Sequence, residues 1–440
     1  MTIPHGLPAG WFGALATGYG EGATVTALRQ AQRSKRMIQL RAILDAVTAR
    51  PDADAAALAE GFALLRAAAE ADPAAADRAL LDPHFGVWAA DCLRPPSGGA
   101  VRAPPGSGLA YLSSFAAVAA WRAGLDFAVP VPVRGGFVTL SGLGQLRTNR
   151  PDGEAVIAAA RDGLLRVDSV TIDEPERDGA GWHALRRLCL TVGGRRLQVA
   201  LDDVDPYRGC HTAGPAHRLT DAEAEVWRRC VSEVWHRLVD VHPRYADGIS
   251  AALVAIVPLT GAGQKQGASA TSRDAFGAVS VRLPSDGLML AEALVHEVQH
   301  VKLGGLLDLL PLYDGADTTT YYAPWREDPR PIGGLFQGAY AFLGVADFWR
   351  GERLVRTGDS ALAAEIRFCR WRHRVSLALD TLLDSGRFGA DGLRFLAYMR
   401  TTVESWRDER VSRRARRAAV EASARHRATW LSLHGTPSGV

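Results

Sequence analysis

Apolar residues recur at intervals of three and four positions through residues 23–76, for example at Leu40, Ile43, Leu44 and Val47. This spacing places them on one face of a helix, and the abundance of Ala, Leu, Arg and Glu favours the same structure. Pro51 and Pro73 should interrupt the pattern, because proline lacks the N–H that a helix interior needs. We therefore predict helices separated at these prolines.

The hydrophobic period changes in the middle of the chain. A loop rich in Pro, Gly and Ser at residues 95–108 leads to a second helical pattern at residues 109–123. Short segments of β-prone residues then follow, at 127–133, 136–140, 167–172, 188–192 and 197–201. Gly193-Gly194 separates the last two, and this dipeptide is typical of a tight hairpin turn.

A capped helix and two more strands precede the most informative segment. Thr220 and Glu223 have the spacing of a capping box, so a helix should begin there and continue to Val241. Apolar runs at 251–259 and 276–283 predict buried strands. Helical patterns return directly after Pro284-Ser285-Asp286 and again at about 331–354, 361–385 and 391–417.

The composition is that of a soluble globular chain. Of 440 residues, 47% are hydrophobic and 22% are charged, with a formal net charge of +3, which excludes disordered, collagen-like and coiled-coil classes. Five cysteines without a CxxC pair encode neither a disulfide framework nor a cysteine zinc site. We see no signal peptide and no membrane-spanning stretch, and we therefore expect a cytoplasmic protein without a membrane anchor.

Positive charge is concentrated near the C-terminus. Residues 401–440 contain eight arginines and four acidic residues. Such a segment can bind nucleic acid or an acidic peptide, but the acidic residues are interleaved and no aromatic series accompanies them. We therefore favour a solvated helix face and do not expect nucleic acid binding.

His296-Glu297-Val298-Gln299-His300 is an HExxH motif inside a predicted helix. A spacing of four residues puts both imidazoles on one face, a turn apart, where they can bind one metal ion with Glu297 beside them. The helix follows strands and has Gly304-Gly305 near its end, which is a typical context for such a site. We prefer this interpretation to two solvated histidines on a surface helix.

Two histidines need a third ligand, and its identity decides the metal. Asp328 precedes Pro329, where a carboxylate is also a natural N-cap, and Gln337 is an amide among apolar residues. Other candidates downstream of the motif are Asp308, Asp314, Asp317, Glu327, Tyr340 and Asp347. A carboxylate with two histidines suits both zinc hydrolysis and Fe(II) oxygenation, so the spacing leaves both open.

The order of the elements predicts an α+β fold, mostly helical, with a small central β-sheet packed against a zincin-like HExxH helix. We divide the chain into four regions. They are an N-terminal helical region (1–125), a β-rich middle region with a helix (126–250), the HExxH metal-site region (251–355) and a C-terminal helical region with a basic tail (356–440).

Several long segments resemble the HExxH-motif proteins of gene clusters for ribosomally made, post-translationally modified peptides (RiPPs). The likeness is carried by LVHEVQHVKLGGLLDLLPLY (294–313), YYAPWREDPRPIGGLFQGAYAFLGVADFWR (321–350), GASATSRDAFGAV (267–279), LDDVDPYRGCH (201–211), LDPHFGVWAADCL (81–93) and ALATGYGEGATVTALRQAQRSKR (14–36). It therefore extends over nearly the whole chain. Members of this group occur alone or fused to radical-SAM maturases, and some are Fe(II)- and 2-oxoglutarate-dependent hydroxylases that oxidise the β-carbon of residues in a precursor peptide.

The resemblance implies that His296 and His300 bind the metal. A histidine can stand in related proteins where Gln337 stands here, so this chain departs from the pattern. Either Asp328 is then the third ligand, or Gln337 binds weakly through its amide oxygen. A 2-oxoglutarate enzyme also needs a cation for the distal carboxylate of that cofactor, and Arg273 and Arg330 are our candidates.

Ser269 and Thr271 are candidates to bind the same carboxylate or the peptide substrate. Our favoured hypothesis is an Fe(II)/2-oxoglutarate-dependent β-hydroxylation of a residue in a precursor peptide, with Glu297 ordering the metal-bound ligands or the substrate. A radical-SAM maturase of the same cluster is a possible partner.

Two other hypotheses stay open. In the first, the protein is a zinc metallopeptidase that cleaves a precursor peptide, with Glu297 as the general base for a metal-bound water. In the second, it is a non-catalytic module that binds a peptide or a partner protein through its basic C-terminal helices.

Overall fold

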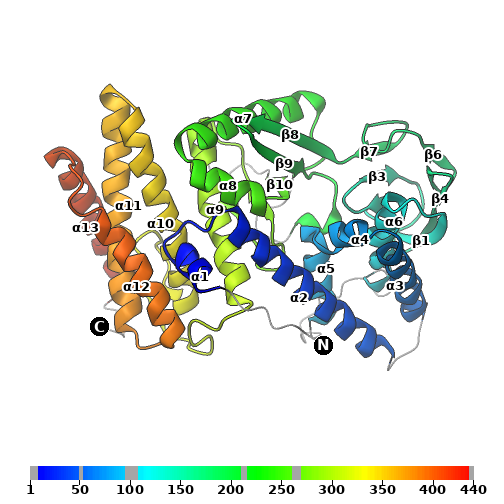
Figure 1. Cartoon of the computed structure of the whole chain (residues 1–440), viewed down its shortest axis with the longest axis horizontal. Helices are drawn as coiled ribbons and strands as arrows, with labels where there is room; N and C mark the ends of the chain where they lie inside the picture. The colour runs from blue at the N-terminus through cyan, green and yellow to red at the C-terminus, as the bar shows by residue number, and fades with distance from the viewer. Residues whose placement is uncertain (1–7, 49–52, 95–107, 210–215, 260–268, 436–440) are drawn as a thin grey trace.

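The computed structural model describes residues 8–48, 53–94, 108–209, 216–259 and 269–435 (Figure 1). Helices make up most of it and two larger β-sheets lie in its first two thirds, so the predicted α+β class is confirmed. Within the described ranges, no helix is both long enough and apolar enough to cross a membrane.

Helices form the first part of the chain, as predicted. They are α1 (Ala9–Ala16), α2 (Gly22–Thr48), α3 (Ala53–Ala71), α4 (Pro73–Leu80), α5 (Pro83–Leu93), the 3₁₀ turn η1 (Leu109–Tyr111) and α6 (Leu112–Arg122). Pro73 is the first residue of α4, after the N-cap Asp72, where its missing N–H costs nothing. The predicted break at Pro73 is therefore confirmed, while Pro51 and the loop at 95–107 lie outside the described residues.

The next sheet curls into a nearly closed antiparallel barrel, on the right of Figure 1. Its strands are β1 (Phe127–Arg134), β2 (Phe137–Leu140), β3 (Gly144–Arg147), β4 (Ala155–Arg161), β5 (Leu164–Val167), β6 (Val170–Ile172) and β7 (Trp182–Ala184), in the order β6-β5-β4-β1-β2-β3-β7. The single strand predicted at 167–172 was wrong. Val167 pairs with Val170 across a turn in which Asp168 has φ 54°, a left-handed conformation that aspartate tolerates.

A second, five-stranded sheet lies next to the barrel. Its strands are β8 (Arg186–Val192), β9 (Arg195–Leu201), β10 (Ala255–Pro258), β11 (Ser269–Ala270) and β12 (Ala278–Val281), in the order β11-β12-β10-β9-β8. Gly193 and Gly194 have φ of 53° and 77° and form the predicted hairpin turn. The strand predicted at 251–259 begins only at Ala255, because its first residues end the preceding helix.

Two helices pack on this second sheet, α7 (Asp221–Val241) and α8 (Pro243–Ala252), after the 3₁₀ turn η2 (Pro206–Arg208). Thr220 and Glu223 form the predicted capping box at the start of α7. The buried residues Val231, Trp235 and Leu238 of α7 belong to the main hydrophobic core. That core continues from this sheet through the C-terminal helices.

The remaining elements are helical apart from two short strands. They are α9 (Gly287–Leu307), β13 (Thr320–Tyr321), β14 (Arg330–Pro331), α10 (Ile332–Val355), α11 (Gly358–Asp384), α12 (Ala390–Ser405) and α13 (Arg413–His434). Helix α9 packs on β11 and β12 on one side and on α10 on the other, and α10 in turn packs on α11 (Figure 1). The HExxH helix is therefore central.

The prediction of one small central sheet was wrong in its extent. The structure has two sheets, and the larger one packs on α3 and α6, far along the chain from α9. Only the five-stranded sheet contacts α9 through β11 and β12, and it combines strands from the two regions that we separated at residue 250. Strand pairing over such sequence distances has no local signal.

Candidate metal centre

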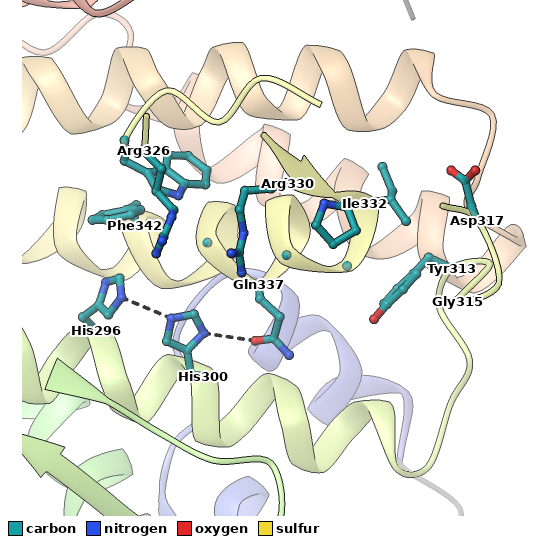
Figure 2. Close-up of a pocket in the computed structure, with 15 residues that line it drawn as sticks. His296, His300, Tyr313, Gly315, Asp317, Arg326, Arg330, Ile332, Gln337 and Phe342 are labelled. Carbon is teal, nitrogen blue, oxygen red and sulfur yellow. Dashed lines mark hydrogen bonds between the residues drawn. The ribbon is translucent and has the colours of Figure 1, made fainter. Parts of the chain in front are cut away.

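Helix α9 holds the two motif histidines on one face. The helix begins where the Asp286 side chain accepts a hydrogen bond of 2.9 Å from the Leu288 N–H. Leu294, Val298 and Val301 are buried in the core and fix the rotation of the helix about its axis. The HExxH segment is therefore helical, as predicted, and its histidines face α10 (Figure 2).

The imidazoles of His296 and His300 converge through their Nε2 atoms, which lie 3.1 Å apart. Two nitrogen ligands at about 2.0–2.1 Å from one metal ion, at octahedral or tetrahedral angles, are separated by roughly 2.8–3.4 Å. The observed spacing therefore fits a pair of ligands to one ion without rearrangement of the helix.

Gln337 from the second turn of α10 fixes the orientation of His300. Its Oε1 lies 3.1 Å from His300 Nδ1, and since an amide oxygen only accepts, Nδ1 must carry the proton (Figure 2). The Nε2 of His300 then keeps its lone pair for a metal. Gln337, our rival third ligand, thus contacts the His300 nitrogen that faces away from His296. From this position its amide orients the His300 ring.

His296 lies in an aromatic environment. The ring of Phe342 approaches it edge-on at 4.7 Å, and Trp371 of α11 stacks on the other side of Phe342 at 4.0 Å. Burial, with a smaller effect of His300, holds the pKa of His296 well below its usual value. The neutral imidazole that a metal requires is therefore the favoured form.

Glu297 is buried, with 2% of its surface exposed, and lines the smaller of two cavities that lie beside the histidine pair. Its Oε1 accepts a hydrogen bond of 2.7 Å from the Ser269 hydroxyl and lies 4.0 Å from His296 Nε2. Burial raises the pKa of Glu297, and His300, Ser269 and Thr271 partly oppose this. Its Oε2 makes no hydrogen bond of ordinary geometry within the described residues.

Two cavities meet at the histidine pair. One, of about 570 Å³, lies between α10 and the segment 313–331, and the other, of about 450 Å³, lies between α9 and the segment 269–276. Five residues line both cavities: His296, His300, Arg326, Arg330 and Gln337. The candidate metal position is thus open from two sides, and each cavity has room for a small molecule or part of a peptide.

The arginines predicted to bind a cofactor have different surroundings. Arg330 lines both cavities and extends toward the histidines, with one contact of 3.3 Å to Asp328 (Figure 2). Arg273 lines only the smaller cavity and donates through Nε and Nη2 to Asp308 at 3.0 and 2.7 Å. Arg330 is therefore better placed than Arg273 to bind a carboxylate beside the histidines.

The structure does not bring Asp328, our first choice of third ligand, together with the histidines. Its carboxylate binds Arg326 at 2.7 Å and Arg330 at 3.3 Å, and it lines neither cavity. In the described part of the chain no three His, Cys, Asp or Glu side chains form a cluster that could hold a metal ion. The protein ligands that these residues provide are the two histidines alone.

Ser269 and Thr271 lie in the smaller cavity, beside Glu297. The Ser269 hydroxyl donates its hydrogen bond to the Glu297 carboxylate, so it does not donate to a ligand. Both side chains thus stabilise the buried Glu297 in its ionised form.

Other residues of the site had no clear sequence signal. The segment between α9 and α10 has little regular structure apart from the short strands β13 and β14. It lines the larger cavity with Tyr313, Trp325 and Arg326. The glycines at the start of α10 were the available hint, because a Cβ at Gly338 would lie 2.4 Å from Trp325 and one at Gly333 2.4 Å from Tyr313. Only glycine permits these close contacts.

Fold and site together define an α+β protein with a histidine pair on a central helix at the junction of two cavities. No protein-family model matches this chain, and no curated protein matches it significantly. Further assignment therefore depends on the chemistry of the site.

Proposed function

We propose that this protein is an Fe(II)- and 2-oxoglutarate-dependent hydroxylase that modifies a residue of a ribosomally made precursor peptide. The observation that carries the proposal is the convergence of two imidazole nitrogens, 3.1 Å apart, beside Arg326 and Arg330 at the meeting point of two cavities. One cavity has room for an acidic cosubstrate and the other for a peptide side chain. The resemblance to RiPP-cluster hydroxylases supports the same assignment.

His296 and His300 would hold the metal as the two protein ligands that the described residues offer, and the fold around α9 would be zincin-like. When bound, Fe(II) supplies the redox chemistry with O₂ and 2-oxoglutarate that the protein side chains lack. Gln337 keeps the proton of His300 on Nδ1, and so leaves Nε2 free to bind. Phe342, which stacks on Trp371, places aromatic surface against the His296 ring.

Arg330 would bind the distal carboxylate of 2-oxoglutarate, because a guanidinium offers two parallel N–H donors to a carboxylate. Arg326 lies on the same cavity and would add positive charge there. The N-terminal end of α10, whose first residues Gly333 and Gly334 line this cavity, contributes the positive end of the helix dipole.

A zinc peptidase is the second candidate, and the position of Glu297 favours it. Its Oε1 lies 4.0 Å from His296 Nε2, and a carboxylate beside the histidines would serve as the general base that zinc hydrolysis requires. The two candidates differ in what happens to the peptide: hydroxylation adds one oxygen atom, whereas hydrolysis yields two shorter products.

The test uses the full chain, loaded anaerobically with Fe(II), together with 2-oxoglutarate, O₂ and the precursor peptide encoded beside its gene. We expect succinate and a peptide heavier by one oxygen, and we expect both to fall at least a hundredfold in the His296→Ala variant. Absence of succinate with the iron-loaded protein contradicts the hydroxylase proposal.

Glu297→Gln separates the two candidates in the same assay. Hydrolysis should collapse by about 10²–10⁴-fold without a general base, while a hydroxylase should retain iron binding and most of its succinate formation. A truncated peptide made by the zinc-loaded wild type and lost in Glu297→Gln establishes the peptidase instead.

A further inference from the structure

A third cavity, of about 550 Å³, lies between the N-terminal helices and the five-stranded sheet. It is lined by residues of α2, α4, the start of α5, the end of α6, α8, β8, β9 and the start of β10. None of them lines the two cavities at the histidine pair. Strand β8 and strand β11 are the opposite edges of this sheet. The cavity lies on the β8, β9 and β10 side of the sheet, whereas the metal centre lies beside β11, and the absence of shared lining residues makes the two sites distinct.

Four arginines from four different elements line this cavity: Arg29, Arg78, Arg122 and Arg187. Arg29, Arg122 and Arg187 contact backbone carbonyls, and none of these three has a carboxylate within 4.0 Å in the described part of the chain. Arg78 reaches Asp72 at 3.4 Å. Three guanidiniums in one cavity thus lack an acidic partner.

Arg122 and Arg187 come particularly close to one another. Both donate to the same carbonyl oxygen, that of Gly142, so that two positive charges converge on a single neutral acceptor. Burial, together with the charges of Arg187 and Arg78, lowers the pKa of Arg122 to about 10, although Asp82 and Glu176 partly oppose this effect. Crowding of like charges costs free energy that a bound anion would recover.

The acidic residues of the same cavity are already used by the protein. Asp77 pairs with Arg33, and Asp82 accepts the backbone N–H of His84 at 2.9 Å as the N-cap of α5. Asp202 binds His84 Nε2 at 2.8 Å and the N–H groups of Val204 and Asp205. Asp82 is the one carboxylate among the described lining residues without a cationic partner within 4.0 Å, and its single charge offsets only part of the charge of Arg29, Arg122 and Arg187.

We propose that this cavity is a second ligand site, which binds an oxyanion, either a carboxylate or a phosphate, between the guanidiniums of Arg122 and Arg187. Planar guanidinium groups bind the two oxygens of such an anion through parallel N–H donors. Arg29 and Arg78 line the same cavity and increase its positive potential. The site is independent of the proposed hydroxylation and does not require a metal.

Isothermal titration of the full chain with inorganic phosphate, and separately with a hexaglutamate peptide, tests this site. We expect saturable binding of at least one probe with one equivalent per chain. Arg187, on an exposed position of β8, is changed first, and Arg187→Gln should weaken that binding. The double variant Arg122→Gln with Arg187→Gln should weaken it tenfold or more. Arg196→Gln is the matched control, because Arg196 is exposed on the neighbouring strand β9 but does not line the cavity.

The two probes distinguish the source of the anion. Binding of phosphate alone identifies a phosphate-bearing small molecule, and tighter binding of hexaglutamate identifies an acidic peptide segment; either result supports the site. The proposal is overturned if neither probe binds saturably, if Arg187→Gln binds as wild type does, or if Arg196→Gln weakens binding equally. Circular dichroism spectra of the variants establish that each one is folded.

Discussion

Gln337 shows how one neutral side chain can prepare a histidine for metal binding. The amide oxygen, 3.1 Å from His300 Nδ1, allows only the tautomer with its proton on that nitrogen. The amide brings no charge of its own, so the charged groups of the larger cavity, apart from the two histidines, are Arg326, Arg330 and Asp317. This combination suits an anionic cosubstrate next to the metal ligands.

Gln337→Leu should therefore weaken metal binding about 10–100-fold, because loss of the partner that orients a histidine ligand typically has an effect of that size. Titration with Co²⁺, followed by its visible absorption, measures the affinity. Gln337→Glu retains an acceptor at the same place and should keep most of the affinity. An unchanged affinity in Gln337→Leu contradicts the orienting role.

The first turns of α10 are built around glycines. The Trp325 ring crosses directly over Gly338, where a Cβ would lie only 2.4 Å from its Cζ2 atom. Tyr313 and Arg330 approach Gly333 and Gly334 in the same way. These contacts hold the wall of the larger cavity against the helix, and they depend on the absence of side chains there.

Gly338→Ala should lower the free energy of unfolding by about 1–3 kcal/mol, because overpacking against Trp325 outweighs the gain in helix propensity. Gly304→Ala in α9 is the matched control. A Cβ there meets nothing within 4 Å, so the same substitution should raise stability by about 0.5–1 kcal/mol. Urea denaturation measures both values, and a stabilised Gly338→Ala variant would show that Trp325 moves away freely.

On the scale of the whole molecule, a buried ionic network joins the barrel, the N-terminal helices and the five-stranded sheet. His84 of α5 binds Asp202 at the end of β9 at 2.8 Å. Asp205 accepts hydrogen bonds from Ser141, in the barrel, and from Tyr111. Burial lowers the pKa of His84, but the neighbouring carboxylates outweigh it and raise the pKa to about 10.

This network predicts a pH-dependent contribution to stability. The pKa of His84 rises from 6.5 to about 10 on folding, which means that the folded protein binds this proton more tightly than the unfolded chain does. The resulting stabilisation of the fold is complete below pH 6.5 and is lost as the pH rises through 10. Burial lowers the pKa of Lys302 to about 7, so the contribution of Lys302 to stability changes with pH in the opposite direction. The test therefore compares wild type with a His84 variant at each pH, because Lys302 is present in both.

We expect the stability advantage of wild type over His84→Gln to be large at pH 6 and to shrink steadily by pH 10, as measured by urea denaturation at several pH values. The exposed His236→Gln variant should differ little from wild type at every pH. A constant difference between wild type and His84→Gln would contradict the charged state of His84.

The sequence by itself determined the features that depend on neighbours along the chain. The helix around His296 and His300, the capping box at Thr220 and the turn at Gly193-Gly194 follow from local spacing and backbone preferences, which need few long-range contacts. The α+β class follows from the order of such elements.

Only the tertiary structure decided which distant groups meet. It placed Gln337 against His300, paired Asp328 with two arginines and brought Arg122 and Arg187 to one carbonyl oxygen. The contacts of Gln337 with His300 and of Arg187 with Gly142 depend on how helices and strands pack across long stretches of chain, whereas Asp328 pairs with arginines only two residues away on either side. A sequence shows that a polar residue needs a partner, but the partner is chosen by packing, because it is packing that removes water and leaves only certain groups within reach.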